Sequence, residues 1–125
     1  MFGMDTTKEE DVQITRLSGV VDAYTAPQFK AKIHGFLIDG EKNNILSMDE
    51  VEYFDSTALG VCIGLLKRSR ELGGLFVIAI TLNNFRVREV FRITGLDKVF
   101  DIYETEREAL DFIRNPARTE AKVGA

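Results

Sequence analysis

The segment from Thr57 to Leu66 is apolar on nearly every side of a helical projection, and it changes abruptly into the cationic run Lys67 to Arg70. A helix on the surface of a domain has one apolar stripe, whereas a helix that is apolar on most sides is buried. Ser56 is well placed as the N-cap residue, and Gly73 can supply a left-handed C-cap. The segment therefore predicts a buried helix in a compact domain.

The rest of the chain alternates between strand and helix patterns. Strands are predicted at residues 12–17, 44–48, 75–81 and 99–103, with a weakly marked strand before the polar residues 5–11. Helices are predicted near residues 25–40, 56–72, 84–95 and 105–115. Strands that alternate with helices form a mainly parallel sheet through right-handed crossovers. The predicted fold class is α/β, a single domain with a four- to five-stranded, mostly parallel sheet and about four helices. The domain would span residues 1–114, with a flexible C-terminal tail at 115–125.

The composition excludes several classes of function. Sixteen Lys and Arg against twenty Asp and Glu give a net charge of −4, so binding to nucleic acid is not expected. One His and one Cys are too few for a Cys/His metal site, and no cofactor is expected. The apolar stretches are shorter than the roughly 20 residues that span a bilayer, and no signal peptide is visible. We therefore expect a cytoplasmic protein without a membrane partner.

Ser56 and Thr57 place two hydroxyl groups at the start of the buried helix. The simplest interpretation of Ser56 is an N-cap. The alternative is a phosphate acceptor, because the free N–H groups and the dipole at a helix N-terminus stabilise a phosphate dianion. Acidic residues nearby would make the charge of such a phosphate add to an existing negative patch. They are Asp49, Glu50, Glu52 and Asp55.

Three further residues have plain structural interpretations. Gly60 and Gly64 follow a small-xxx-small pattern, which most often lets a helix pack closely on a sheet and could also admit a partner helix. His34, on an amphipathic helix, is most simply a surface residue. Its position disfavours a third reading of the chain, in which Ser56 is the nucleophile of a small enzyme and needs a histidine base.

Three motifs together resemble the STAS family of bacterial anti-sigma factor antagonists, also called anti-anti-sigma factors. The first runs from Asp55 to Gly60, the second from Gly19 to Pro27, and the third from Phe91 to Phe100. Their order and spacing agree with the family from about Val12 to Ile113. The coincidence of three motifs is specific, whereas each alone would be weak.

The resemblance implies a regulator of the sporulation or general-stress type that is not an enzyme. In its unphosphorylated form it would bind an anti-sigma factor and release a sigma factor. The anti-sigma factor would be a GHKL-type serine kinase that phosphorylates Ser56, or failing that Thr57, and a PP2C-type phosphatase would reverse the step. The implied contact surface comprises Asp22, Asp55, Ser56, Thr57, Ala58 and Leu59.

Two qualifications come with the resemblance. Many relatives have Asp where this chain has Ser47, so we expect the polar network around the phosphorylation site to differ here. An alternative function is that of a constitutive STAS scaffold or assembly subunit, in which Ser56 is only a helix cap.

Overall fold

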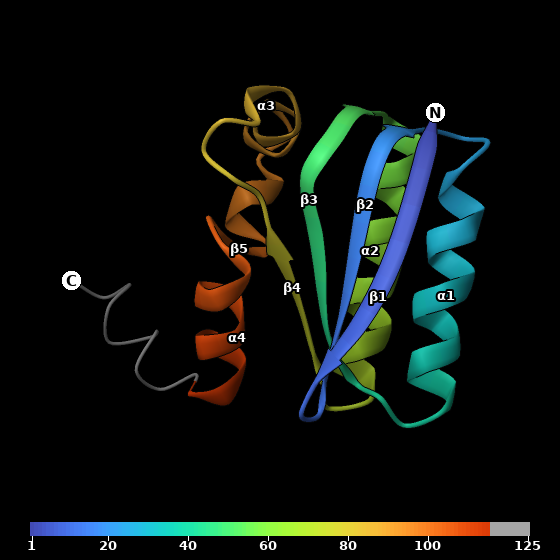
Figure 1. Cartoon of the computed structure of the whole chain (residues 1–125), viewed down its shortest axis with the longest axis vertical. Helices are drawn as coiled ribbons and strands as arrows, with labels where there is room; N and C mark the ends of the chain where they lie inside the picture. Colours follow the sequence, from blue (N-terminus) through green and yellow to red (C-terminus); the bar gives the residue numbers. More distant parts are fainter. Residues whose placement is uncertain (116–125) are drawn as a thin grey trace.

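The computed structural model describes residues 1–115, which form an α/β domain around one sheet (Figure 1). The strands are β1 (Phe2–Glu9), β2 (Val12–Val21), β3 (Asn43–Phe54), β4 (Leu75–Ala79) and β5 (Asp101–Tyr103). The helices are α1 (Ala26–Ile38), α2 (Ser56–Glu71), α3 (Phe85–Ile93) and α4 (Glu106–Arg114), with a short 3-10 helix, η1, at Leu96–Lys98. The five strands lie in the order β1-β2-β3-β4-β5, and only β1 runs antiparallel to its neighbour. The predicted fold class is confirmed.

The first strand is longer than the sequence pattern indicates. Residues 5–9 were expected to separate two strands, but they belong to β1, which pairs with β2 from Phe2 opposite Gly19 to Glu9 opposite Val12. β1 is an edge strand, and its apolar residues Phe2 and Met4 pack against the core. Charged and polar side chains are common on edge strands because they discourage pairing with other chains. That polarity hides the strand from a pattern search.

β3 also extends well beyond the predicted end at residue 48. Its last residues pair only with β2, from Ser18 opposite Glu50 to Val21 opposite Phe54, because β4 ends earlier. Glu50 is exposed on this extension and breaks the apolar run on which the prediction was based. The extension carries the chain directly to the start of α2.

The helices cover the two faces of the sheet unequally. The buried residues of α1, α2 and α3 share one apolar cluster with the sheet, whereas those of α4 form a second cluster on the other face. Cys62 is a fully buried member of the larger cluster, and burial raises the pKa of its thiol. Ser47 alternates with Leu46 of the larger cluster and lies beside Ala79 of the smaller one. It therefore faces away from α2, so the expected change in the network around Ser56 has no structural basis here.

α2 is less completely buried than its apolar sequence predicts. Gly60 and Gly64 are exposed, and a Cβ atom built at either position would meet nothing within 4 Å. The prediction that they let α2 pack closely on the sheet is therefore wrong. Within the described residues, no helix is long and apolar enough to cross a membrane. Residues 116–125 of the predicted tail lie outside the described range.

Candidate functional site

The predicted site lies where two parallel strands end side by side. Val21, the last residue of β2, pairs with Phe54, the last residue of β3. The amide of Asp55 donates a hydrogen bond to the carbonyl oxygen of Val21 at 3.2 Å. The loop that begins at Asp22 and the start of α2 are therefore neighbours, although more than thirty residues separate them in the sequence. Their arrangement at the carboxyl edge of the sheet brings two of the three family-like motifs together (Figure 1).

Asp55, and not Ser56, is the N-cap of α2. Its backbone is extended, and its carboxylate accepts a hydrogen bond from the amide of Ala58 at 3.0 Å. Asp and Ser are almost equally good N-caps, so the sequence could not choose between adjacent candidates. Ser56 becomes the first helical residue, with an exposed side chain. Within residues 1–115 its hydroxyl has no hydrogen-bond partner, and no base is hydrogen-bonded to it.

The Asp22 loop is held by its own hydrogen bonds. The carboxylate of Asp22 accepts from the amides of Tyr24 and Thr25 at 2.9 and 3.1 Å. The hydroxyl of Thr25 accepts from the amide of Asp22 at 2.9 Å and lies 3.0 Å from the carbonyl oxygen of Val20, to which it can donate. Such reciprocal bonds between side chain and backbone fix a turn. The loop next to Ser56 is therefore an ordered surface.

The six predicted contact residues divide by burial. Ser56 and Thr57 are exposed, and Asp22 and Asp55 are partly exposed. Ala58 and Leu59 are buried in the core, so their part in the predicted contact surface stays a prediction. They face inward because α2 packs against the sheet through this side of its first turn.

Two exposed aromatic residues near the site were missed. Tyr24 in the Asp22 loop is 90% exposed, and Tyr53 near the end of β3 is 54% exposed. Exposed tyrosines supply a large, rigid contact area and are enriched in protein interfaces. Tyr53 could have been identified from the sequence. It follows Glu50 and Glu52 in a polar stretch and lies two residues before the motif that begins at Asp55.

Three of the four acidic residues that precede Ser56 line a hollow that does not include Ser56. Asp49, Glu50 and Glu52 line a separate hollow with the residues that follow β4. Asp49 accepts a hydrogen bond from the amide of Thr81 at 2.6 Å, and burial raises the pKa of its carboxyl group. The acidic neighbours that the fold brings to the start of α2 are Asp55 and, from the other strand end, Asp22.

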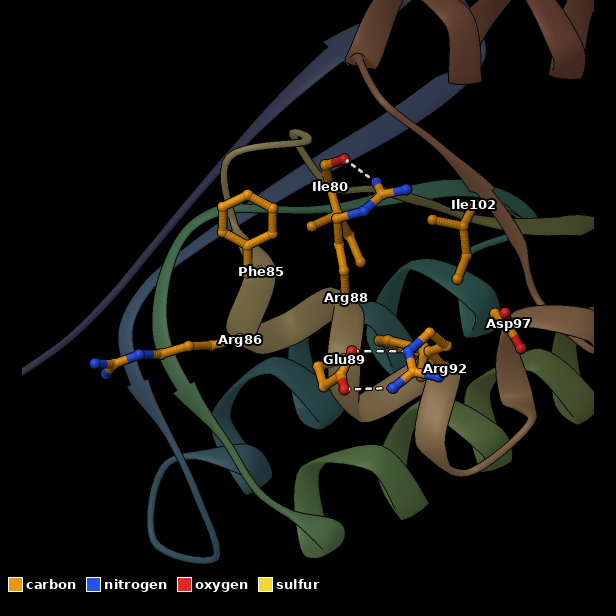
Figure 2. Close-up of a pocket in the computed structure, with 9 residues that line it drawn as sticks. Ile80, Phe85, Arg86, Arg88, Glu89, Arg92, Asp97 and Ile102 are labelled. Carbon is orange, nitrogen blue, oxygen red and sulfur yellow. Dashed lines mark hydrogen bonds and ion pairs between the residues drawn. The ribbon is translucent and has the colours of Figure 1, made fainter.

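Another pocket, of about 650 Å³, lies between α3 and β5 (Figure 2). Of the three arginines that line this pocket, two are hydrogen-bonded to other groups of the protein and one points away from the pocket. Arg88 donates to the carbonyl oxygen of Ile80 at 3.0 Å, Arg92 donates to Glu89 at 2.8 Å, and Arg86 points away from the pocket. Ser56 and Asp22 are not among its lining residues, so it is not part of the predicted site.

Two substitutions of Asp55 distinguish its role as the N-cap of α2 from the effect of its negative charge. Asp55→Ala should lower the free energy of unfolding by about 1 kcal/mol, because the amide of Ala58 loses its acceptor. Asp55→Asn retains a capping oxygen and should unfold at nearly the same urea concentration as the wild type. Urea denaturation of the three proteins measures both effects. Equal losses in both variants would contradict the role of Asp55 as a cap.

Comparison with known proteins agrees with this geometry. The STAS domain family model matches residues 3–109, so the chain belongs to the STAS family. A protein of Thermotoga neapolitana, named as a candidate anti-sigma factor antagonist, is 36% identical over 106 residues, which cover 84% of this chain and 92% of that protein. The expected family is thereby confirmed.

Solved structures show the same fold. An anti-sigma factor antagonist from Mycobacterium paratuberculosis superposes with a TM-score of 0.83 at 23% identity, covering 92% of this chain and 96% of that one. SpoIIAA, an anti-sigma factor antagonist that is also described as a Bacillus cell fate determinant, has been solved in unphosphorylated and phosphorylated forms. The unphosphorylated form superposes with a TM-score of 0.74 at 24% identity, covering 91% of this chain and 96% of that one.

Proposed function

We propose that this protein is an anti-sigma factor antagonist controlled by phosphorylation of Ser56. Unphosphorylated, it binds an anti-sigma factor and thereby releases a sigma factor; phosphorylated, it no longer binds. The observation that carries the proposal is the exposed hydroxyl of Ser56, which is unbonded within the described residues and stands beside the ordered Asp22 loop. The existence of a phosphorylated form of SpoIIAA supports it by analogy.

The position of Ser56 suits phosphoryl transfer by a partner enzyme. The Ser56 oxygen would attack the γ-phosphorus of ATP, the bond to the bridging oxygen would break, and ADP would leave with its magnesium ion. The hydroxyl proton would pass to a base of the kinase, because no base of residues 1–115 is hydrogen-bonded to Ser56. This chain would therefore be the substrate of the reaction and not its catalyst.

A phosphate on Ser56 would change the surface without unfolding the domain. The hydroxyl makes no hydrogen bond within the described residues, so none of those bonds is lost, and the N-terminal end of α2 favours negative charge. The phosphate adds about −1.5 to −2 charges beside Asp55 and Asp22. An interface formed with the neutral hydroxyl would then contain an unpaired, desolvated charge, and such a charge weakens binding strongly.

The family resemblance supplies the remaining partners of this proposal. The kinase would be the anti-sigma factor itself, of the GHKL type, and a PP2C-type phosphatase would regenerate the binding form. The switch would operate in the cytoplasm, without nucleic acid or membrane as a partner.

The alternative of a constitutive scaffold is weakened by the capping geometry. In that alternative the hydroxyl of Ser56 serves only as the cap of α2. Asp55 performs that task, so the hydroxyl has no structural role within the described residues. Thr57 remains the second candidate acceptor, because its side chain is also exposed.

Incubation with ATP, magnesium and a GHKL-type anti-sigma factor from the same organism tests the proposal. Mass spectrometry of the digested protein should locate one phosphate on Ser56, and the Ser56→Ala variant should stay unmodified while still binding the anti-sigma factor. Thr57→Ala is the matched control and should be phosphorylated as the wild type is. Phosphate on Thr57 alone would move the site, and no phosphate with any such kinase would support the scaffold.

A further inference from the structure

A groove of about 510 Å³ is lined by residues of α1 and α2. The two helices pack side by side (Figure 1). The exposed lining residues of the groove include Lys30 and His34 of α1 and Thr57, Gly60, Gly64 and Lys67 of α2. Because Thr57 is adjacent to Ser56, the groove begins at the proposed phosphorylation site. It follows α2 toward the end of that helix.

On two successive turns of α2 the groove is lined by a glycine, Gly60 and Gly64, neither of which has a side chain. Neither Gly60 nor Gly64 is required by internal packing, since a Cβ atom at either would meet nothing within 4 Å. Glycine in the interior of a helix is less favourable than alanine. What the two glycines provide is a helix backbone open to close approach by another helix.

The charges along the groove favour an acidic occupant. Among residues 1–115, Lys30 and Lys67 have no acidic partner, whereas Arg68 is paired with Glu71 at 3.0 Å. These two uncompensated cations flank the groove in a chain whose net charge is −4. A segment that brings carboxylates to this groove would find both charge complementarity and space.

Resting on the proposed function, we infer that the groove binds an acidic amphipathic helix of the anti-sigma factor. Small residues of that helix would lie against Gly60 and Gly64, and its carboxylates would pair with Lys30 and Lys67. α2 from Thr57 to the end of the groove is about 20 Å long, so a helix of about four turns fits. Phosphate on Ser56 would stand at the end of this acidic helix and repel it. Phosphorylation of Ser56 would thus weaken binding by repelling the helix that occupies the groove.

Filling the groove tests the inference without disturbing the core. Gly64→Leu should fold normally and weaken binding of the purified anti-sigma factor at least tenfold in a calorimetric titration. Gly35→Leu is the matched control, because Gly35 lies on α1 outside the groove and also has open space around its Cβ position. Lys67→Glu should weaken binding likewise, whereas Lys98→Glu, with an exposed lysine on η1, should not.

A second probe is independent of the proposed function. A synthetic four-turn helical peptide with one glutamate stripe and one alanine stripe should shift the NMR signals of Gly60 and Gly64. The shifts should vanish in Gly64→Leu, persist in Gly35→Leu, and be absent with a peptide in which lysine replaces glutamate. Absence of these shifts from the wild type would overturn the groove as a site for acidic helices.

The outcomes separate the two proposals. Tight binding of the anti-sigma factor by the wild type and Gly64→Leu alike overturns the groove inference and leaves the proposed function standing. Peptide binding without any binding of an anti-sigma factor overturns the proposed function and the identity of the occupant. A wild type that sediments as a dimer, with Gly64→Leu a monomer, would assign the groove to a second copy of this chain.

Discussion

Ser56→Asp should fold like the wild type and bind the anti-sigma factor roughly 30- to 900-fold more weakly, which corresponds to about 2–4 kcal/mol. The carboxylate mimics part of the phosphate charge beside Asp55 and Asp22. Its burial against a partner leaves a desolvated charge without a counterion, and this accounts for the loss. Calorimetric titration against the purified anti-sigma factor measures the change in Kd, and thermal unfolding checks the fold.

The matched variant Ser56→Asn separates charge from size. Asn has nearly the shape of Asp and no charge, so Ser56→Asn should bind far more tightly than Ser56→Asp. If both variants lost affinity equally, steric exclusion would explain the effect and the electrostatic account would be wrong. If both bound as tightly as the wild type, the Ser56 surface would lie outside the interface.

Phe91→Ala should lower the free energy of unfolding by about 3–5 kcal/mol, the largest stability effect we expect of any single substitution discussed. Phe91 is 1% exposed, and its ring centroid lies 5.9 Å from that of Phe54 and 5.4 Å from that of Phe100. Phe54 is the last residue of β3 and directly precedes the cap of α2. Loss of the Phe91 ring therefore removes packing directly beneath the proposed site. Urea denaturation measures the loss.

Phe85→Ala is the control for this prediction, because Phe85 lies on the same helix and is 76% exposed. Its removal should change the free energy of unfolding by less than about 0.5 kcal/mol. A loss of similar size in both variants would show that α3 tolerates no shortened side chain, and it would contradict the packing argument for Phe91.

Local patterns predicted the regular part of this protein well. The apolar run predicted as a strand at 75–81 contains the buried parallel strand β4, which ends at residue 79. The helix predicted near 84–95 is α3, and its cap Asn84 accepts a hydrogen bond from the amide of Val87. These features depend on interactions between residues close in sequence, or on burial on both faces of a sheet. The apolar pattern did not predict the full length of the edge strand β1. One face and the outer edge of this strand meet solvent, and polar residues are therefore permitted there.

Local sequence patterns predicted the candidate site only in part. The motifs were sufficient to mark Asp22, Asp55 and Ser56, but not to tell which of the adjacent residues caps α2. That choice depends on the extended backbone of Asp55, which the pairing of Val21 with Phe54 leads into. With Asp55 as the cap, the hydroxyl of Ser56 is free of hydrogen bonds within the described residues.

By itself, the sequence determined the fold class, the family resemblance and the residues that flank the start of α2. Only the tertiary structure decided that Ala58 and Leu59 face the core and that Gly60 and Gly64 face outward. The physical reason is that α2 is apolar or small on nearly every side, so its own composition cannot say which side packs against the sheet. The packing of α1 and the sheet against α2 makes that choice.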